Sequence, residues 1–473
     1  MRKSTTLALA LLLSGCNLAP PHVRPELPTA PAYPSPPTSL GDGGQQVAAI
    51  RLDMFLADPR LERLIDQALQ RNRDLRIAVG RIEEARGLYR IQNADRLPTL
   101  DATGSANRQR VPGPTGPETS SNFAVGVAVT SFELDFWGRV KNLSEAARRE
   151  YLATIHAQRA FRLSLIRDVA STYFASLEGG ERIALAEAAL VSRQEALRIA
   201  LKRMDAGVTS ELDYRQAETL LTDAQRDLAS LKLTRAQADN YLSVLVGGPV
   251  QGPLPPPLPL ARQTAVPALS AGLPSQLLVN RPDILADEER LRAARANIGA
   301  ARASFFPTIS LTGNSGLAST ALGSLFTGSA FTWGVGPSIH LPIFDFGRNK
   351  ANLTVAEARE NIAVATYEKT VQQAFREVSD ALAGRAYYAA QVAAQQRGLV
   401  ANQRISRLAT LRYREGVASY LEVLDAERNL FAAQQALVTT YRLQAANLVA
   451  LYLALGGGSA GLAEPVATGV GGV

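Results

Sequence analysis

The feature that most constrains this chain is an internal duplication with an offset of 209 residues. Landmark residues of the first half recur at that offset in the second half, within matching local sequences. The pairs are Pro98 and Pro307, Gly138 and Gly347, Gly207 and Gly416, and the double glycines at 247–248 and 456–457. A repeat of this kind means that one structural unit is present twice. Any fold or function for the chain has to accommodate two similar halves.

Composition and charge exclude several classes of protein. The 473 residues carry 50 basic and 43 acidic side chains, a net charge of +7, and loss of Arg2 and Lys3 with a signal peptide leaves about +5. No polybasic block interleaved with aromatic residues occurs, so nucleic acid is not an expected partner. No apolar run reaches the roughly 18 residues of a membrane-spanning helix. Composition does not exclude a membrane β-barrel, because the strands of a barrel leave only a weak alternating pattern in the sequence.

The N-terminus has the pattern of an export signal. A basic start at residues 1–3 precedes an apolar stretch at 7–13, which ends in Leu-Ser-Gly before Cys16, the only cysteine. The segment resembles a bacterial lipobox, which predicts a lipoprotein signal peptide at residues 1–15 and acylation of Cys16. An ordinary signal peptide followed by a free thiol is the alternative. Asn17 after the cysteine resembles the sorting pattern for the outer membrane.

Residues 16–60 are rich in proline, with eight prolines from Pro20 to Pro37. Proline at this density prevents helix formation and favours an extended, semi-rigid strap. We therefore expect a lipidated tether that joins the lipid to the folded body. A disordered leader is the alternative.

Strands are expected where the periodicity changes after Pro98. Phe123, Val125, Val127 and Val129 alternate with small residues, which is typical of a strand with two different faces. Strands of this length approach the 9–11 residues needed to cross a membrane at a tilt. The expected strands are 99–110 and 122–135, separated by a loop at 111–117, and their counterparts 308–316 and 330–341.

Long helices are expected in the two stretches without proline, 118–248 and 343–464. A helix of 64 residues is roughly 95 Å long. The return helix of the first half has a 4,3 spacing of Ala and Leu from Ala217 to Leu245, interrupted at Arg235, which is typical of a coiled-coil seam. A kink or break is expected at Gly179–Gly180. The expected helices are 61–94, 141–204, 210–246, 350–413 and 419–455.

Four strands per chain are too few to close a membrane barrel. Single-chain outer-membrane barrels begin at eight strands, and an open edge in lipid leaves backbone groups unpaired. Several chains therefore have to share one barrel: two give eight strands and three give twelve. Aromatic and cationic residues just beyond the strands suit the membrane interface, with simple core packing as the alternative. These residues are Trp137, Arg139, Phe346 and Arg348.

Two segments, together with the lipobox and the duplication, resemble a known family. One is Phe-Glu-Leu-Asp-Phe-Trp-Gly-Arg at 132–139, and the other is Gly-Val-Ala-Ser-Tyr-Leu-Glu-Val-Leu-Asp-Ala at 416–426. They resemble the outer membrane factor family of TolC-type channels, in the lipoprotein form of multidrug efflux systems. The resemblance covers about residues 50–458. The duplication and the proline- and glycine-rich stretches predict this division: repeat 1 at 61–248, a linker or equatorial segment at 249–280, repeat 2 at 281–456, and a flexible tail at 457–473.

The resemblance implies an α+β membrane protein that works as a homotrimer. Four strands from each chain would form a twelve-stranded outer-membrane β-barrel, which continues into a long periplasmic α-helical coiled-coil barrel. The protein is then lipid-anchored in the cell outer membrane and extends into the periplasm. It passively exports drugs and other small molecules that an inner-membrane efflux transporter passes on through a periplasmic adaptor (membrane fusion) protein.

A gate is expected just after the second turn. Threefold symmetry would turn each side chain of this helix face into a ring at the closed end of the tunnel, with Leu421 as an apolar plug. The six carboxylates would attract cations and repel one another, so that opening relieves strain, and Arg428 would neutralise part of their charge in the closed state. An ordinary solvated helix face is the alternative. The gate residues are Leu421, Glu422, Asp425 and Arg428. The resemblance also assigns adaptor contacts to the turns: Ala206, Gly207, Val208, Thr209, Glu415, Gly416, Val417 and Ala418.

An enzyme is not expected. None of the three histidines, His22, His156 and His340, has a partner at a metal-ligand spacing, so neither a metal nor a cofactor is predicted. Gly334-Val335-Gly336 lies on an expected strand rather than before a helix, which excludes a phosphate loop. Two other functions stay open: a structural coiled-coil lipoprotein that conducts nothing, and a channel for type I protein secretion.

Overall fold

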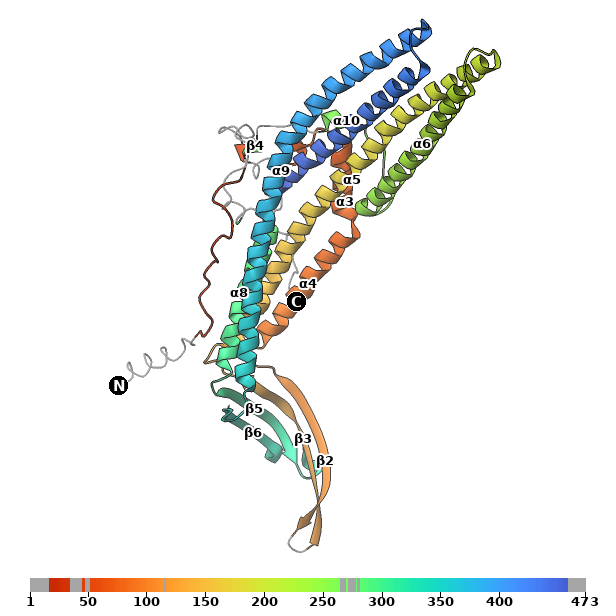
Figure 1. The fold of residues 1–473 in the computed structure, drawn as a ribbon. Coiled ribbons are helices and arrows are strands. Elements are labelled where there is room, and N and C mark those ends of the chain that lie inside the picture. The colour runs from red at the N-terminus through yellow and green to blue at the C-terminus, as the bar shows by residue number, and fades with distance from the viewer. Residues whose placement is uncertain are drawn as a thin grey trace. The chain divides into compact units, whose positions relative to one another are not determined.

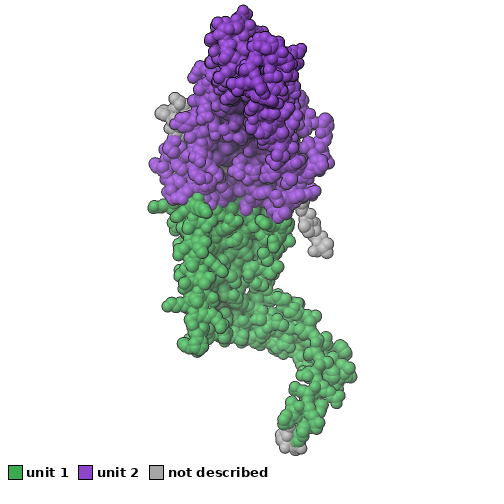
Figure 2. All heavy atoms as spheres, turned by 45° about the vertical axis from the view of Figure 1, so that its right-hand side comes forward, with its two compact units in different colours: residues 1–26, 80–156, 285–369 green, residues 27–79, 157–284, 370–473 purple. Residues whose placement is uncertain are grey.

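The computed structural model describes residues 17–34, 45–46, 52–113, 116–263, 269–270, 278 and 281–457. The predicted signal peptide, Cys16 and the predicted tail beyond residue 457 lie outside these ranges. The chain divides into two compact units, which Figure 2 shows in different colours. Unit 1 comprises residues 1–26, 80–156 and 285–369, and unit 2 comprises residues 27–79, 157–284 and 370–473.

The duplication is visible in the helix boundaries (Figure 1). Both ends of α4 and α5 recur at an offset of 209 residues in α8 and α9, and α5 and α9 are each 67 residues long. The long helices and their returns match the predicted ranges to within two residues at each end. The helices are α2 (Leu52–Phe55), α3 (Pro59–Arg71), α4 (Arg73–Ala94), α5 (Arg139–Asp205), α6 (Glu211–Val246), α8 (Pro282–Ala303), α9 (Arg348–Arg414) and α10 (Tyr420–Ala454).

Unit 1 contains a four-stranded antiparallel sheet of order β2-β3-β5-β6. Four strands were predicted, and their bounds are β2 (Asp101–Gly113), β3 (Gly116–Glu133), β5 (Thr308–Ser319) and β6 (Phe331–His340). The predicted loop at 111–117 is wrong at both ends, because β2 extends to Gly113, β3 begins at Gly116, and Pro112 lies opposite Pro117. Gly126 faces Gly316, and a Cβ on Gly126 would lie 2.6 Å from the carbonyl oxygen of Ser315. Two repeats therefore join at a place where only glycine fits.

The described part of the proline-rich strap in unit 1 is bound along α8. Arg24 forms an ion pair with the buried Glu288 at 2.7 Å, and Arg295 donates to the carbonyl oxygen of Val23 at 2.7 Å. Closer to Cys16, Arg302 donates to the carbonyl oxygen of Leu18 at 3.3 Å. A short parallel pair, β1 (Gln45–Gln46) with β4 (Leu269–Ser270), follows in unit 2. The strap is thus held by specific polar contacts.

Four helical segments of unit 2 form a row in the order α6–α5–α10–α9 (Figure 1). Leu228 of α6 packs against Ile183 of α5, and Phe431 of α10 adjoins the same cluster. Ala409 of α9 packs against Val423 and its neighbours on α10. The row ends with α6 on one side and α9 on the other. In the described part of the chain, no helix is both long and apolar enough to cross a bilayer.

The prediction of one helix over 61–94 is wrong, because the chain divides at Asn72 into α3 and α4. Asn72 leaves helical geometry with ψ 133°. Its side chain accepts from the backbone N–H of Leu75 and donates to the carbonyl oxygen of Leu245, both at 2.9 Å. Asparagine competes well for backbone groups at helix ends, so it caps α4 and ties this junction to α6.

The predicted break at Gly179–Gly180 is also wrong, because α5 is helical through both glycines. A Cβ on Gly179 would lie 2.8 Å from the Cβ of Arg235 on α6. Arg235 is the residue that interrupts the apolar seam of α6. The glycine therefore gives room to a large side chain of the neighbouring helix instead of bending its own.

A buried carboxylate connects several elements of unit 2. Asp58 is fully buried and accepts from the Tyr173 hydroxyl at 2.7 Å, from the Gln263 side chain at 3.0 Å and from the backbone N–H of Leu258 at 3.1 Å. Burial and this hydrogen bond raise the pKa of Tyr173. Asp58 thus fixes α3, α5 and the linker segment with its short 3₁₀ turn, η2 (Leu260–Arg262).

Candidate functional site

The two turns at the ends of the helical hairpins are built alike. Gly207 and Gly416 have φ values of 70° and 76°, which side chains other than glycine rarely adopt. In each turn, the following residue donates back to the helix, from Val208 to Arg203 and from Val417 to Arg412, both at 2.9 Å. Val208 and Val417 are 64% and 69% exposed. Each turn therefore presents an apolar side chain to its surroundings.

The two turns differ in how the next helix is capped. Thr209 donates to Asp213 at 2.5 Å, and Ser210 and Asp213 form a capping box at the start of α6. The hydrogen bond from Thr209 holds the pKa of Asp213 below its usual value. Ser419, the equivalent residue before α10, makes no such side-chain bond. The second turn has the weaker cap, and the predicted gate residues follow it.

The predicted gate residues all lie on the first turns of α10. Leu421 is 51% exposed. Glu422 is 3.6 Å from Arg412 of α9, and Asp425 is 3.5 Å from Arg428. Asp425 is paired with Arg428 of its own helix, and the gate role of these residues stays a prediction. Arg412 was missed, because no sequence pattern connects it with Glu422. Both carboxylates are therefore paired in this conformation.

An aromatic and cationic contact joins the two hairpins beside these residues. Arg203 of α5 donates to the Tyr413 hydroxyl at 2.5 Å, and its guanidinium lies 5.0 Å from the centre of the same ring. Tyr413 packs against Tyr420 at 5.2 Å across the second turn. Burial, reinforced by the nearby carboxylates of Glu427 and Asp213, raises the pKa of Tyr420 to about 12. The tyrosines, seven residues apart around Gly416, were the available sequence signal for this contact.

A second, more buried contact lies further along the helices. Arg193 of α5 is only 7% exposed, stacks on Phe431 of α10 at 5.4 Å and donates to the carbonyl oxygen of Leu220 on α6 at 3.2 Å. Burial raises the pKa of Glu427, while the charge of Arg193 opposes the shift. One cation thus links three helices next to a carboxyl group that ionises with difficulty.

The predicted membrane-interface residues lie in unit 1 and differ in their surroundings. Trp137 donates to the carbonyl oxygen of Pro307 at 2.9 Å and stacks on Phe306 at 4.6 Å. Arg139 forms a two-point ion pair with Glu133. Phe346 is 89% exposed beside Phe344, and Arg348 begins α9. Only the Phe346 side of this group presents free aromatic surface; Trp137 and Arg139 are engaged within the chain.

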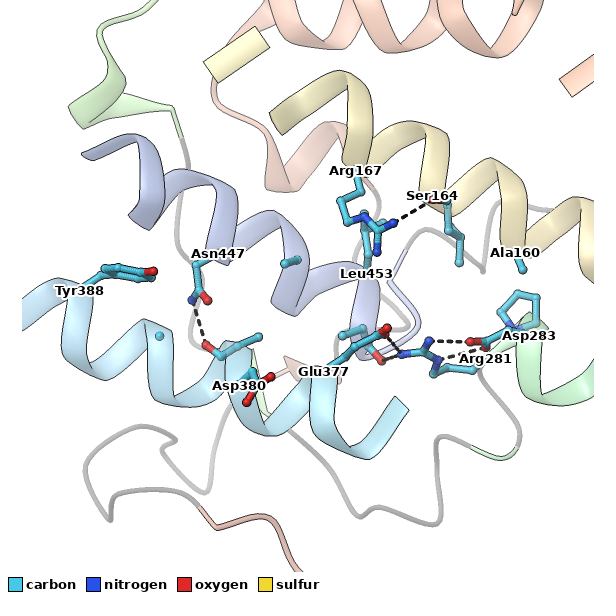
Figure 3. Close-up of a pocket in the computed structure, with 16 residues that line it drawn as sticks. Ala160, Ser164, Arg167, Arg281, Asp283, Glu377, Asp380, Tyr388, Asn447 and Leu453 are labelled. Atoms are coloured by element: carbon cyan, nitrogen blue, oxygen red, sulfur yellow. Dashed lines mark hydrogen bonds and ion pairs between the residues drawn. The ribbon is translucent and has the colours of Figure 1, made fainter. Parts of the chain in front are cut away.

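A cavity of about 520 Å³ lies elsewhere in unit 2, between α5, α9 and α10 (Figure 3). Its most buried charge, Arg281, is held by Asp283 at 2.6 Å and by Glu377 at 2.8 Å. Asn447 donates to the carbonyl oxygen of Ala381 at 2.9 Å. The two carboxylates neutralise Arg281 and fix the start of α8 against α9. The Asn447 bond separately joins α10 to α9. The arrangement serves to anchor helix ends and contains no nucleophile with an adjacent base.

The fold and the helix-end site define a class: a duplicated subunit with a small antiparallel sheet, two long helical hairpins and a cluster of paired charges at their turns. The chain belongs to the outer membrane efflux protein family, whose sequence profile matches residues 64–248 and 273–457. The two matches are themselves 209 residues apart. The predicted family is confirmed, and this family is one of efflux proteins, not of enzymes.

Named relatives are similar along nearly the whole chain. The solvent efflux pump outer membrane protein SrpC of Pseudomonas putida is 45% identical over 463 residues, covering 96% of this chain and 98% of that protein. The cation efflux system protein CusC of Escherichia coli K12 is 41% identical over 452 residues, with 95% and 98% covered. The open-state MtrE outer membrane channel of Neisseria gonorrhoeae superposes with a TM-score of 0.85 at 40% identity, covering 94% and 98%.

Proposed function

We propose that the protein is the outer membrane channel of a tripartite efflux pump, which passively exports small molecules. The observation that carries the proposal is the family match over both repeats together with relatives named as efflux pump outer membrane proteins at up to 45% identity. Those relatives are named for solvents, toluene, antibiotics and cations. An inner-membrane efflux transporter and a periplasmic adaptor are the partners of such a channel.

The channel is a homotrimer with a shared twelve-stranded barrel in the outer membrane. The support is the sheet of unit 1, in which β2 and β6 each pair on one side only among the described strands. In a membrane such an edge has to be paired, because lipid offers no hydrogen bonds. The side chains that alternate along β6, Phe331, Trp333, Val335 and Ile339, are 59–71% exposed and suit lipid contact. Acylated Cys16 anchors each copy to the same membrane.

The long helices of three copies form the periplasmic tunnel, and the first turns of α10 form its gate. Threefold symmetry places Leu421, Glu422, Asp425 and Arg428 in rings. Six carboxylates around one axis repel one another unless they are neutralised, and Arg412 and Arg428 supply that neutralisation in each copy. The contact of Arg203 with Tyr413 holds the hairpins together on the same level. Breaking this contact lets the hairpins separate and opens the tunnel, while both carboxylates keep their arginine partners within the second hairpin.

The adaptor binds the two turns. Residues 206–209 and 415–418 lie at the ends of the hairpins, and Val208 and Val417 present exposed apolar side chains there. Exposed apolar side chains at the end of a hairpin offer surface that is favourable to bury against a partner. The duplication gives each copy two such turns, so that three copies offer six positions to adaptor molecules.

The proposal is tested by deletion and by conductance. Loss of the gene is expected to make cells sensitive to solvents or antibiotics, and resistance should return only when channel, adaptor and transporter are present together. Purified protein should form trimers in detergent and give discrete single-channel currents in planar bilayers. A trimer without current would favour a structural envelope lipoprotein, and a defect confined to secreted proteins would favour type I secretion.

A further inference from the structure

The end of α9 carries a row of arginines, most of which have no counter-charge among the described residues. Between residues 391 and 414 the chain has five arginines and no acidic residue. Arg412 contacts Glu422. The other four are exposed and make no ion pair or hydrogen bond with any residue that the structure describes: Arg397, Arg404, Arg407 and Arg414. Such a row on one helix favours a partner that brings negative charge.

The start of α6 has the opposite charge. Residues 211–227 contain five acidic residues and only two arginines. Arg215 serves both Glu211 and Glu218, at 3.3 and 3.0 Å, in contacts within the same helix. All three side chains are largely exposed, and exposed pairs of this kind hold only weakly. The carboxylates of Glu211 and Glu218 are therefore free to exchange this shared arginine for better partners.

The two helices stand at opposite ends of the helix row α6–α5–α10–α9 in unit 2 (Figure 1). Each therefore has one flank without a helix neighbour in the described part of its unit. In a closed ring of copies around one axis, the last helix of one copy lies beside the first helix of the next. Rotation about an axis parallel to the helices keeps both at the same height. The contact of Arg203 with Tyr413 shows that the ends of the two hairpins lie at the same height along the helix axes within one copy.

The spacing of the charges fits this arrangement. The last residue of α9, Arg414, lies at the same level as the first residue of α6, Glu211, and the two helices run in opposite directions. Seven residues before its end α9 carries Arg407, and seven residues after its start α6 carries Glu218. Seven residues are about two turns, or roughly 10 Å, so each pair of like residues lies on one side of its helix. In one register, Arg414 thus lies opposite Glu211 while Arg407 lies opposite Glu218.

We propose that Arg407 and Arg414 of one copy bind Glu218 and Glu211 of the next copy, so that each junction between copies is an electrostatic seam. The inference rests on the proposed channel with its ring of copies and adds the residues that join them. The seam lies next to the gate, because α9 leads directly into the turn before Leu421. High salt should therefore weaken the junction where the tunnel opens.

Charge reversal in the full-length channel tests the seam, with heat dissociation of the detergent-solubilised trimer as the readout. Arg407→Glu and Glu218→Arg should each lower the dissociation midpoint, because the loss of one attraction is repeated at every junction. The double variant should recover most of that loss. The matched control combines Arg407→Glu with Glu211→Arg, a pair two turns out of register, which should recover little.

The outcomes separate the two proposals. Recovery in the matched double variant but not in the mismatched one supports the seam. The seam is overturned if the trimers are stable but the midpoint changes of the two single variants simply add in the double variant. It is also overturned if the matched and the mismatched double variants recover equally. Neither result bears on the proposed channel. A native protein that is monomeric in detergent and without conductance overturns the proposed channel itself.

Discussion

Two carboxylates per chain distinguish the first turns of α10 from the rest of the helix surface. Glu422 and Asp425 are each within 4 Å of an arginine, so their charge is balanced but remains near the proposed axis. Negative rings in a pore attract cations and repel each other. The double variant Glu422→Ala and Asp425→Ala should therefore raise single-channel conductance and lower the preference for cations.

Planar bilayer recordings with a salt gradient measure both quantities. Glu415→Ala is the control, because it also removes one exposed carboxylate near the second turn but not from α10. Unchanged conductance and selectivity in the double variant would place the gate elsewhere in the tunnel.

Glu427 gives the same region a dependence on pH. Burial raises its pKa, so the folded protein favours the protonated form. Its contribution to stability is complete below the ordinary glutamate pKa and is lost as the pH rises through the raised value. Glu427→Gln keeps the neutral form at every pH. The melting temperature of the variant should therefore equal that of the native protein at about pH 4 and exceed it at about pH 7.

Thermal unfolding followed by circular dichroism across this range provides the measurement. Glu415→Gln, an exposed position in the turn, should leave the pH profile unchanged. A constant difference between Glu427→Gln and the native protein at all pH values would mean that ionisation of Glu427 plays no part.

At the scale of helices, Gly179 shows how one missing methyl group sets a helix–helix distance. A Cβ there would lie 2.8 Å from the Cβ of Arg235, whereas a Cβ on Gly180 meets that side chain only at 3.6 Å, at its flexible end. Gly179→Ala should destabilise unit 2 by about 1–3 kcal/mol through overpacking. Gly180→Ala should be neutral or stabilising by up to about 1 kcal/mol, because alanine favours the helix. Denaturant unfolding of the two variants compares them directly; equal stabilities would contradict the packing role of Gly179.

The helices also show what the sequence could and could not predict. The bounds of α5 and α9 were accessible because these stretches lack proline and repeat at one offset. The division at Asn72 was not, since it depends on a hydrogen bond to Leu245, far along the chain. The same holds for the proposed gate: its α10 residues lie in one local motif, whereas Arg203 and Arg412 reach it only through tertiary packing. Local sequence patterns thus predicted the helices and strands, whereas contacts between residues far apart in the chain could be found only in the structure.

For the whole molecule, the proposed membrane barrel requires one face of β6 to meet lipid and the other to meet water. Trp333 is 71% exposed on the face that carries Phe331 and Val335, and Thr332 beside it points to the other face. A cation in lipid costs about 2–4 kcal/mol near the bilayer midplane, whereas a cation facing a water-filled lumen costs little. Trp333→Arg should therefore lower the yield of membrane-inserted trimer, and Thr332→Arg should leave it near native.

Outer-membrane fractions separated on heated and unheated gels measure that yield. Because the two substitutions are adjacent and introduce the same charge, a difference between them reports which face meets lipid. Equal yields for both would mean that β6 does not separate lipid from water. The four strands would then be an exposed sheet of a periplasmic protein, and the edges of β2 and β6 would need a different partner from the neighbouring copies.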